Sequence, residues 1–195
     1  MDIYNNADKQ LASTSKQMMS NESDNPLDDF SGCHEGIIEN FRQLQQLVEL
    51  TGQAEMSSEI RQLANKLLTF FKEVVVEHHA EEEQELFTAV MDSALKGAEA
   101  DQAKTCIDQL VAEHRQLESM WASIEPDIRR LSRGKVAKLD REQAQQLAQK
   151  YLAHAQFEEQ FFLPLSARIL SKNDLSALGL SLHMRHQDSS VSGYI

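Results

Sequence analysis

Four long segments of this chain carry apolar residues at the three- and four-residue spacing of a buried helical face. Residues 28–50, 57–96, 99–132 and 140–170 all show it. The chain has only 7 glycines and 3 prolines in 195 residues, and no strand-like alternation is bounded by turns. We therefore expect an all-α fold, in which short loops join four helices into an up-down-up-down antiparallel bundle.

Composition divides the chain into three regions. Residues 1–27 are polar and predict an N-terminal arm. Residues 28–170 form the expected bundle. Within residues 171–195, Asn173 and Asp174 can cap a short tail helix that precedes a polar end. Pro126 predicts a kink in the third helix, and Pro164 predicts a bend late in the fourth.

The charge, hydropathy and cysteine content of the chain bear on its binding partners and its cellular location. A formal net charge of -12 argues against nucleic acid and against an anionic membrane surface. No apolar run approaches the ~20 residues that span a bilayer, and no export signal is visible at the N-terminus. Cys33 and Cys106 are far apart and are interpreted as reduced thiols. We expect a cytoplasmic protein.

Each predicted helix carries one histidine on its apolar face. These residues are His34, His78, His114 and His154. A buried imidazole costs free energy unless it is hydrogen-bonded or bound to a metal. A single such histidine is usually a core residue bonded to a carbonyl or to water, but one on each of four helices favours a shared metal site.

Two of these histidines begin a repeated motif. HHAEEEQELF starts at His78, HAQFEEQFFL starts at His154, and each places a glutamate four residues later, Glu82 and Glu158. Residues i and i+4 lie on one helical face about 6 Å apart, so both can reach one ion. Four imidazoles and two carboxylates, with no thiolate, suit iron or manganese better than structural zinc. The sequence thus predicts a dinuclear site.

Some neighbouring residues compete for these roles. His79 and Glu83 form a rival pair turned by about 100° around the helix. When His78 is aligned with His154, the EEQ that begins at Glu82 aligns with the EEQ that begins at Glu158, and no other alignment does this. We therefore expect His79 to contact a ligand from outside the site or to lie at the surface. Glu118, one turn after His114, is an alternative ligand or an acceptor for a ligand. His183 is expected at the surface of the tail.

The chain resembles the hemerythrin-like (HHE cation-binding) family of non-haem di-iron four-helix bundles over roughly residues 28–170. The residues that match the family are His34 in CHEGII, His78 and Glu82 in HHAEEEQELF, His114 in VAEHRQL, and His154 and Glu158 in HAQFEEQFFLP. The resemblance implies two iron ions with a bridging oxo or hydroxo ligand, manganese being possible. It implies His34 and His154 on one ion, His78 and His114 on the other, and Glu82 and Glu158 between them.

Departures from the oxygen carriers of that family bear on function. Their third helix has His-x-x-x-His, where this chain has Glu118, and their fourth helix ends its motif in aspartate one residue later than Glu158. The set of 4 His and 2 Glu is similar to that of di-iron proteins that repair iron-sulfur centres. That subgroup usually has an additional cysteine-containing domain at its N-terminus, which we do not expect here.

The resemblance implies binding of a small diatomic or oxidant, O2 or NO, for sensing, storage, detoxification or iron delivery and repair. A metal- and diatomic-binding protein is favoured over an enzyme, because the Glu-x-x-His spacing of ferritin-like oxidases is missing: Ser31, Val75, Val111 and Tyr151 stand three residues before the four histidines. A di-iron oxidase or peroxidase-like enzyme and a metal-free structural bundle remain the alternatives. The oligomeric state is left open.

Overall fold

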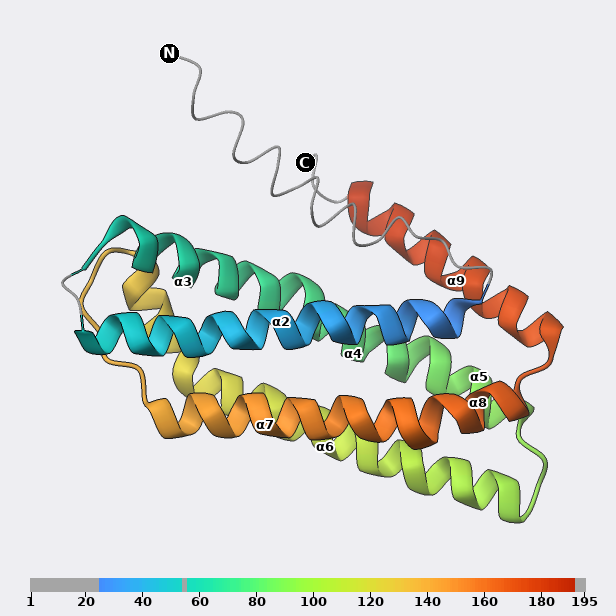
Figure 1. Ribbon diagram of the computed structural model, residues 1–195. Helices are drawn as coiled ribbons and strands as arrows, with labels where there is room; N and C mark the ends of the chain where they lie inside the picture. Colours follow the sequence, from blue (N-terminus) through green and yellow to red (C-terminus); the bar gives the residue numbers. More distant parts are fainter. Residues whose placement is uncertain (1–24, 54–55, 192–195) are drawn as a thin grey trace.

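The computed structural model describes residues 25–53 and 56–191, and these residues form helices without a strand (Figure 1). The expected all-α fold is therefore confirmed. The expected N-terminal arm lies almost entirely outside the described residues. None of the helices in the described part is long and apolar enough to cross a membrane.

Four helical rods and one further helix follow one another along the chain. Two of the rods contain short π-helical turns, labelled η, within an otherwise α-helical path. The elements are α2 (Pro26–Gln53); α3 (Ser58–Phe70), η1 (Phe71–Val75), α4 (Val76–Glu81), η2 (Glu82–Leu86) and α5 (Phe87–Ser93); α6 (Ala98–Ser132); α7 (Arg141–Phe157), η3 (Glu158–Phe162) and α8 (Leu163–Ile169); and α9 (Lys172–Val191).

Local sequence explains where the rods begin and end. The side chain of Ser57 accepts a hydrogen bond from the Ile60 amide and caps α3, and Asp140 caps α7 in the same way. Gly134 follows α6 with φ of 72°, a left-handed conformation that favours glycine at a helix end. Pro126 lies inside α6, which continues through it to Ser132.

The rods pack side by side as a helical bundle. α2 contacts α3 and α7, and α6 contacts the same two helices, so the four rods enclose a common interior (Figure 1). α9 lies outside this set against α2, η2 and α5. The described residues therefore form a helical bundle, with α9 packed against one end of it.

Buried polar residues separate two apolar clusters inside the bundle. On α2, Phe30 belongs to one cluster and Ile37 to the other, with His34 between them. The same arrangement recurs on α6, where His114 stands between Leu110 and Leu117. The second and fourth rods meet the two clusters in the reverse order, Val75 before Leu86 and Tyr151 before Phe162. A polar layer thus crosses all four rods at one level.

Candidate metal centre

The six side chains that the sequence predicted as metal ligands all lie in this polar layer. Each is between 0% and 3% exposed. They come from all four rods: His34 from α2, His78 from α4, Glu82 from the start of η2, His114 from α6, His154 from α7 and Glu158 from the start of η3.

The two glutamates lie between imidazoles of different helices. Glu82 places Oε1 at 3.2 Å from Nε2 of His78 and Oε2 at 3.3 Å from Nε2 of His114. Glu158 places Oε2 at 2.8 Å from Nε2 of His34 and at 3.6 Å from Nε2 of His154. Each carboxylate therefore joins two rods, as a ligand shared by two ions would.

Most of these inward-facing atoms have no hydrogen-bond partner. The unpartnered atoms include Nε2 of all four histidines, Oε2 of Glu82 and both carboxylate oxygens of Glu158. A buried polar group left unsatisfied costs about 1–3 kcal/mol. Cations would accept these lone pairs, and imidazole nitrogen with carboxylate oxygen is a donor set suited to iron or manganese. The residues present therefore fit a metal centre.

The donor atoms fall into two adjoining groups that share both glutamates. In each group, one ligand atom per residue lies within 4.8 Å of every other. The groups are His34, His78, Glu82 and Glu158, and His114, His154, Glu82 and Glu158. Ring centroids lie 4.9 Å apart for His34 and His78, and 4.8 Å apart for His114 and His154. These distances group His34 with His78 and His114 with His154. The pairing implied by the resemblance, His34 with His154 and His78 with His114, follows the two shared carboxylates instead and stays a prediction.

A second set of carboxylates holds three of the imidazoles from outside. In each pair the ring Nδ1 faces the carboxylate, which leaves Nε2 directed inward. The pairs are His34 with Glu159 at 2.9 Å, His114 with Glu83 at 2.8 Å and His154 with Glu113 at 3.0 Å. Such contacts fix the tautomer and orientation of metal-binding histidines.

Sequence reasoning did not identify this outer set, although the repeat contained a signal for it. Glu83 and Glu159 directly follow Glu82 and Glu158 in the repeated EEQ. The first glutamate of each pair turns inward, and the second reaches a histidine on a neighbouring rod. Glu83 and Glu159 are less buried than their inward neighbours and keep 20% and 37% of their side chains exposed.

Both shared glutamates stand at the first residue of a π-helical turn. The amide of Phe87 bonds to the carbonyl of Glu82, and the amide of Leu163 bonds to that of Glu158, each spanning five residues in place of four. Such single widened turns are rare and often coincide with functional sites. Helical periodicity did not predict them.

His79 lies in the interior. It is 1% exposed, its ring stacks on His114 with centroids 4.0 Å apart, and its Nδ1 is 3.2 Å from Oε1 of Glu118. The expectation that His79 could lie at the surface is therefore wrong. The reason is its place on a rod between α2 and α6, where two successive side chains can both face inward. Glu118 contacts His79 as an acceptor.

Burial gives the cluster an unusual protonation balance. Desolvation, followed by the charge of Glu158, raises the pKa of Glu82 well above its ordinary value. Desolvation, followed by neighbouring histidines, lowers the pKa of His78 and takes that of His114 to about 2. The imidazoles of His78 and His114 are therefore held neutral, which is the state that binds metal. Against desolvation, which would lower it, the pKa of His34 is raised instead, because its contacts with Glu158 and Glu159 outweigh desolvation. A cation nearby would favour the charged form of Glu82.

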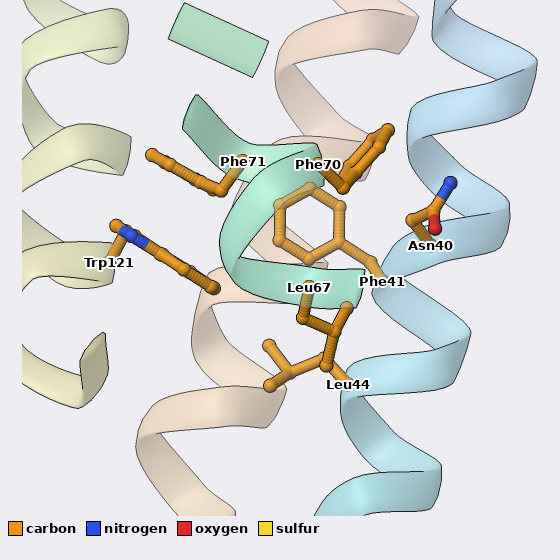
Figure 2. A pocket seen from close by; sticks show the side chains of 7 residues that line it. All are labelled: Asn40, Phe41, Leu44, Leu67, Phe70, Phe71 and Trp121. Atoms are coloured by element: carbon orange, nitrogen blue, oxygen red, sulfur yellow. The ribbon is translucent and has the colours of Figure 1, made fainter. Parts of the chain in front are cut away.

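The Tyr151 side chain lies beside the candidate metal centre, and a small apolar cavity lies beyond it. The hydroxyl of Tyr151 is fully buried without a hydrogen-bond partner, and burial followed by the charges of Glu82 and Glu158 raises its pKa. The Tyr151 ring lies 4.9 Å from that of Phe41. Phe41 borders an apolar cavity of about 10 Å³ between α2, α3, η1 and α6, where Phe71 and Trp121 stack (Figure 2). This space suits only a molecule of about the size of water.

Comparison with known proteins identifies the family of the chain. The chain is 23% identical over 162 residues to an uncharacterized protein of Haemophilus influenzae. This alignment covers 83% of this chain and 90% of the relative. The family model for the hemerythrin HHE cation binding domain matches residues 25–166, which include every residue of the polar layer described above. The chain therefore belongs to the hemerythrin HHE cation binding domain family.

Proposed function

We propose that this protein is a non-haem di-iron protein that binds a small diatomic or oxidant, O2 or NO, for sensing, storage, detoxification or iron delivery and repair. The observation that carries the proposal is the convergence of unpartnered, buried donor atoms from four rods. The proposed ligands are His34, His78, Glu82, His114, His154 and Glu158. The alternating order in which the rods meet the two apolar clusters supports an up-down-up-down arrangement around them.

The donor set supports iron first and manganese second. Six imidazole and carboxylate ligands shared by two ions, without a thiolate, differ from a structural zinc site, which holds one ion and usually includes cysteine. A bound iron pair would supply electron transfer to, and direct binding of, a small oxidant. The protein residues would hold the ions, keep His78 and His114 neutral and exclude bulk water from the layer.

The surroundings of the centre support a very small ligand. The polar layer is buried between two apolar clusters, and the cavity beside Phe41 is small and apolar. The free hydroxyl of Tyr151 is a donor that a polar ligand in the layer could use. Tyr151→Phe is expected to keep the metal content and to weaken NO binding by about fivefold, the value of one neutral hydrogen bond.

Metal quantification with spectroscopy tests the proposal. Protein expressed in iron-replete medium should contain two transition-metal ions per chain, with an absorption spectrum that changes when the reduced protein meets O2 or NO. His183→Ala changes an exposed histidine on α9 and serves as the control, with unaltered metal content. Purified wild-type protein without bound transition metal would instead support the metal-free structural bundle.

A further inference from the structure

We infer that His79 supplies a fifth imidazole to the metal centre, at the position formed by His114 and His154. The inference rests on the proposed di-iron function, and it adds a ligand from α4 that the repeated motif does not contain. It gives the two metal positions different donor sets, with three imidazoles at one and two at the other.

The inner nitrogen of His79 is placed as a ligand atom would be. His79, His114 and His154 each offer a nitrogen within 4.8 Å of the other two. Nε2 of His79 is buried and has no hydrogen-bond partner, as is the case for Nε2 of His114 and His154. A histidine with a purely structural role in a core would have this nitrogen bonded to a carbonyl or a hydroxyl.

The outer nitrogen of His79 follows the pattern of the other imidazoles. Its Nδ1 lies 3.2 Å from Oε1 of Glu118, just as Glu83 and Glu113 hold the outer nitrogens of His114 and His154. Arg115 in turn holds Glu118 at 3.1 Å and also pairs with Glu83. One arginine thus fixes the carboxylates behind two stacked imidazoles, which is the arrangement that orients metal-binding histidines.

The backbone explains how adjacent histidines can serve one centre. His78 and His79 lie on α4, a segment of six residues between the π-helical turns η1 and η2. Successive side chains on a helix point about 100° apart. The ring of His78 lies 4.9 Å from His34 of α2, whereas the ring of His79 lies 4.0 Å from His114 of α6. The second rod therefore contributes one imidazole to each group.

The test replaces His79 with an apolar residue of similar size. In His79→Leu the affinity for one of the two metal ions should fall about tenfold or more, and the gain in Tm on metal loading should shrink. The metal-free variant should have an unchanged or higher Tm, because an unpartnered buried nitrogen is removed. His183→Leu, on the exposed face of α9, is the matched control and should behave as wild type.

A measurement on the wild-type protein makes the test independent of how the variant folds. Proton NMR of the reduced, iron-loaded protein should show hyperfine-shifted imidazole N–H signals from five histidines, and His79→Leu should lose one of them. Signals from only four histidines, or unchanged metal affinity in folded His79→Leu, would overturn the inference and leave the di-iron proposal intact. Wild-type protein that binds no metal would overturn both.

Discussion

Glu82 has an environment that an isolated carboxylate would not tolerate. Its side chain is 1% exposed, and its two oxygens face imidazoles from different rods. Burial and the charge of Glu158 raise its pKa. An ionised carboxylate in such a place requires compensating positive charge. The residue is therefore adapted to a state in which cations are bound.

Glu82→Ala should remove at least one metal equivalent per chain and lower the Tm of the iron-loaded protein by about 5–10 °C, because the stabilisation that comes from binding is lost. Metal analysis and thermal unfolding by circular dichroism measure both effects. The matched control is Glu77→Ala, since Glu77 lies on the same rod, in α4, with 54% of its side chain exposed. A larger effect from Glu83→Ala would show that the inward frame is misassigned.

At the scale of elements, the π-helical turns set the direction of the shared ligands. A widened turn adds one residue to the helical path, so it changes which side chains face the interior without ending the helix. η2 and η3 both begin at a shared glutamate. The repeat in the sequence is thus matched by a repeat in backbone geometry.

Deletion of Gln84 should remove the widened turn η2. Gln84 is the exposed middle residue of this turn, so the shortened rod can continue as an α-helix. Leu86 and the residues after it would then turn by about 100° relative to His78 and Glu82, so the rod could no longer bury both its apolar residues and these ligands. We expect helical circular dichroism close to wild type and loss of metal binding. Gln84→Ala removes only the hydrogen bond from Arg185 and should retain the metal. A deletion variant with full metal content would show that the widened turn is dispensable.

α9 makes polar contacts with the second rod at Glu81 and Glu85, which flank the proposed metal ligand Glu82 in sequence. Ser181 donates to Glu85 at 2.6 Å, and Nε2 of His186 lies 2.7 Å from Oε1 of Glu81. The hydrogen bond to Glu81 raises the pKa of His186 above its ordinary value of 6.5, against burial and the charge of Arg185. We therefore expect the docking of α9 to depend on pH.

This contact should stabilise α9 fully below pH 6.5 and be lost as the pH rises through the raised pKa of His186. Hydrogen exchange of residues 176–186, corrected for intrinsic rates, should show less protection at pH 8.5 than at pH 6. His186→Ala should be equally protected at both values, at the lower level. A wild-type protein whose corrected protection does not change with pH would contradict this role.

At the scale of the whole molecule, the polar layer divides the core in two. The apolar clusters on either side contain most of the large buried side chains, including Ile37, Leu44 and Leu147 in one and Leu86 and Phe162 in the other. Burial of this kind is the main stabilising contribution to a domain. The bundle should therefore persist without metal, although the layer between the clusters would hold unpartnered groups.

Removal of metal under reducing conditions with a chelator should lower the Tm while leaving most helical circular dichroism at 20 °C. Metal at 100 times its dissociation constant contributes about 2.7 kcal/mol to the folded state, which corresponds to ~5–10 °C for a chain of this size. Readdition of iron should restore the Tm. A chelated protein that unfolds at the same temperature as the loaded one would show that the cations do not stabilise the bundle.

The sequence by itself determined the helices, the buried face of each and the histidine on it. These features are local, since the spacing of apolar residues and the positions of Ser57, Asp140 and Gly134 fix them without long-range contacts. The internal repeat also identified Glu82 and Glu158, of all the acidic residues, as those that turn inward.

Only the tertiary structure decided how these residues combine. The grouping of His34 with His78, the inward position of His79 and the outer carboxylates all depend on which rods are neighbours and on how each is rotated. The widened turns at Glu82 and Glu158 are decided there as well. Helical periodicity places a residue on a face, but it does not specify what lies opposite, because that contact is made by residues distant in the chain.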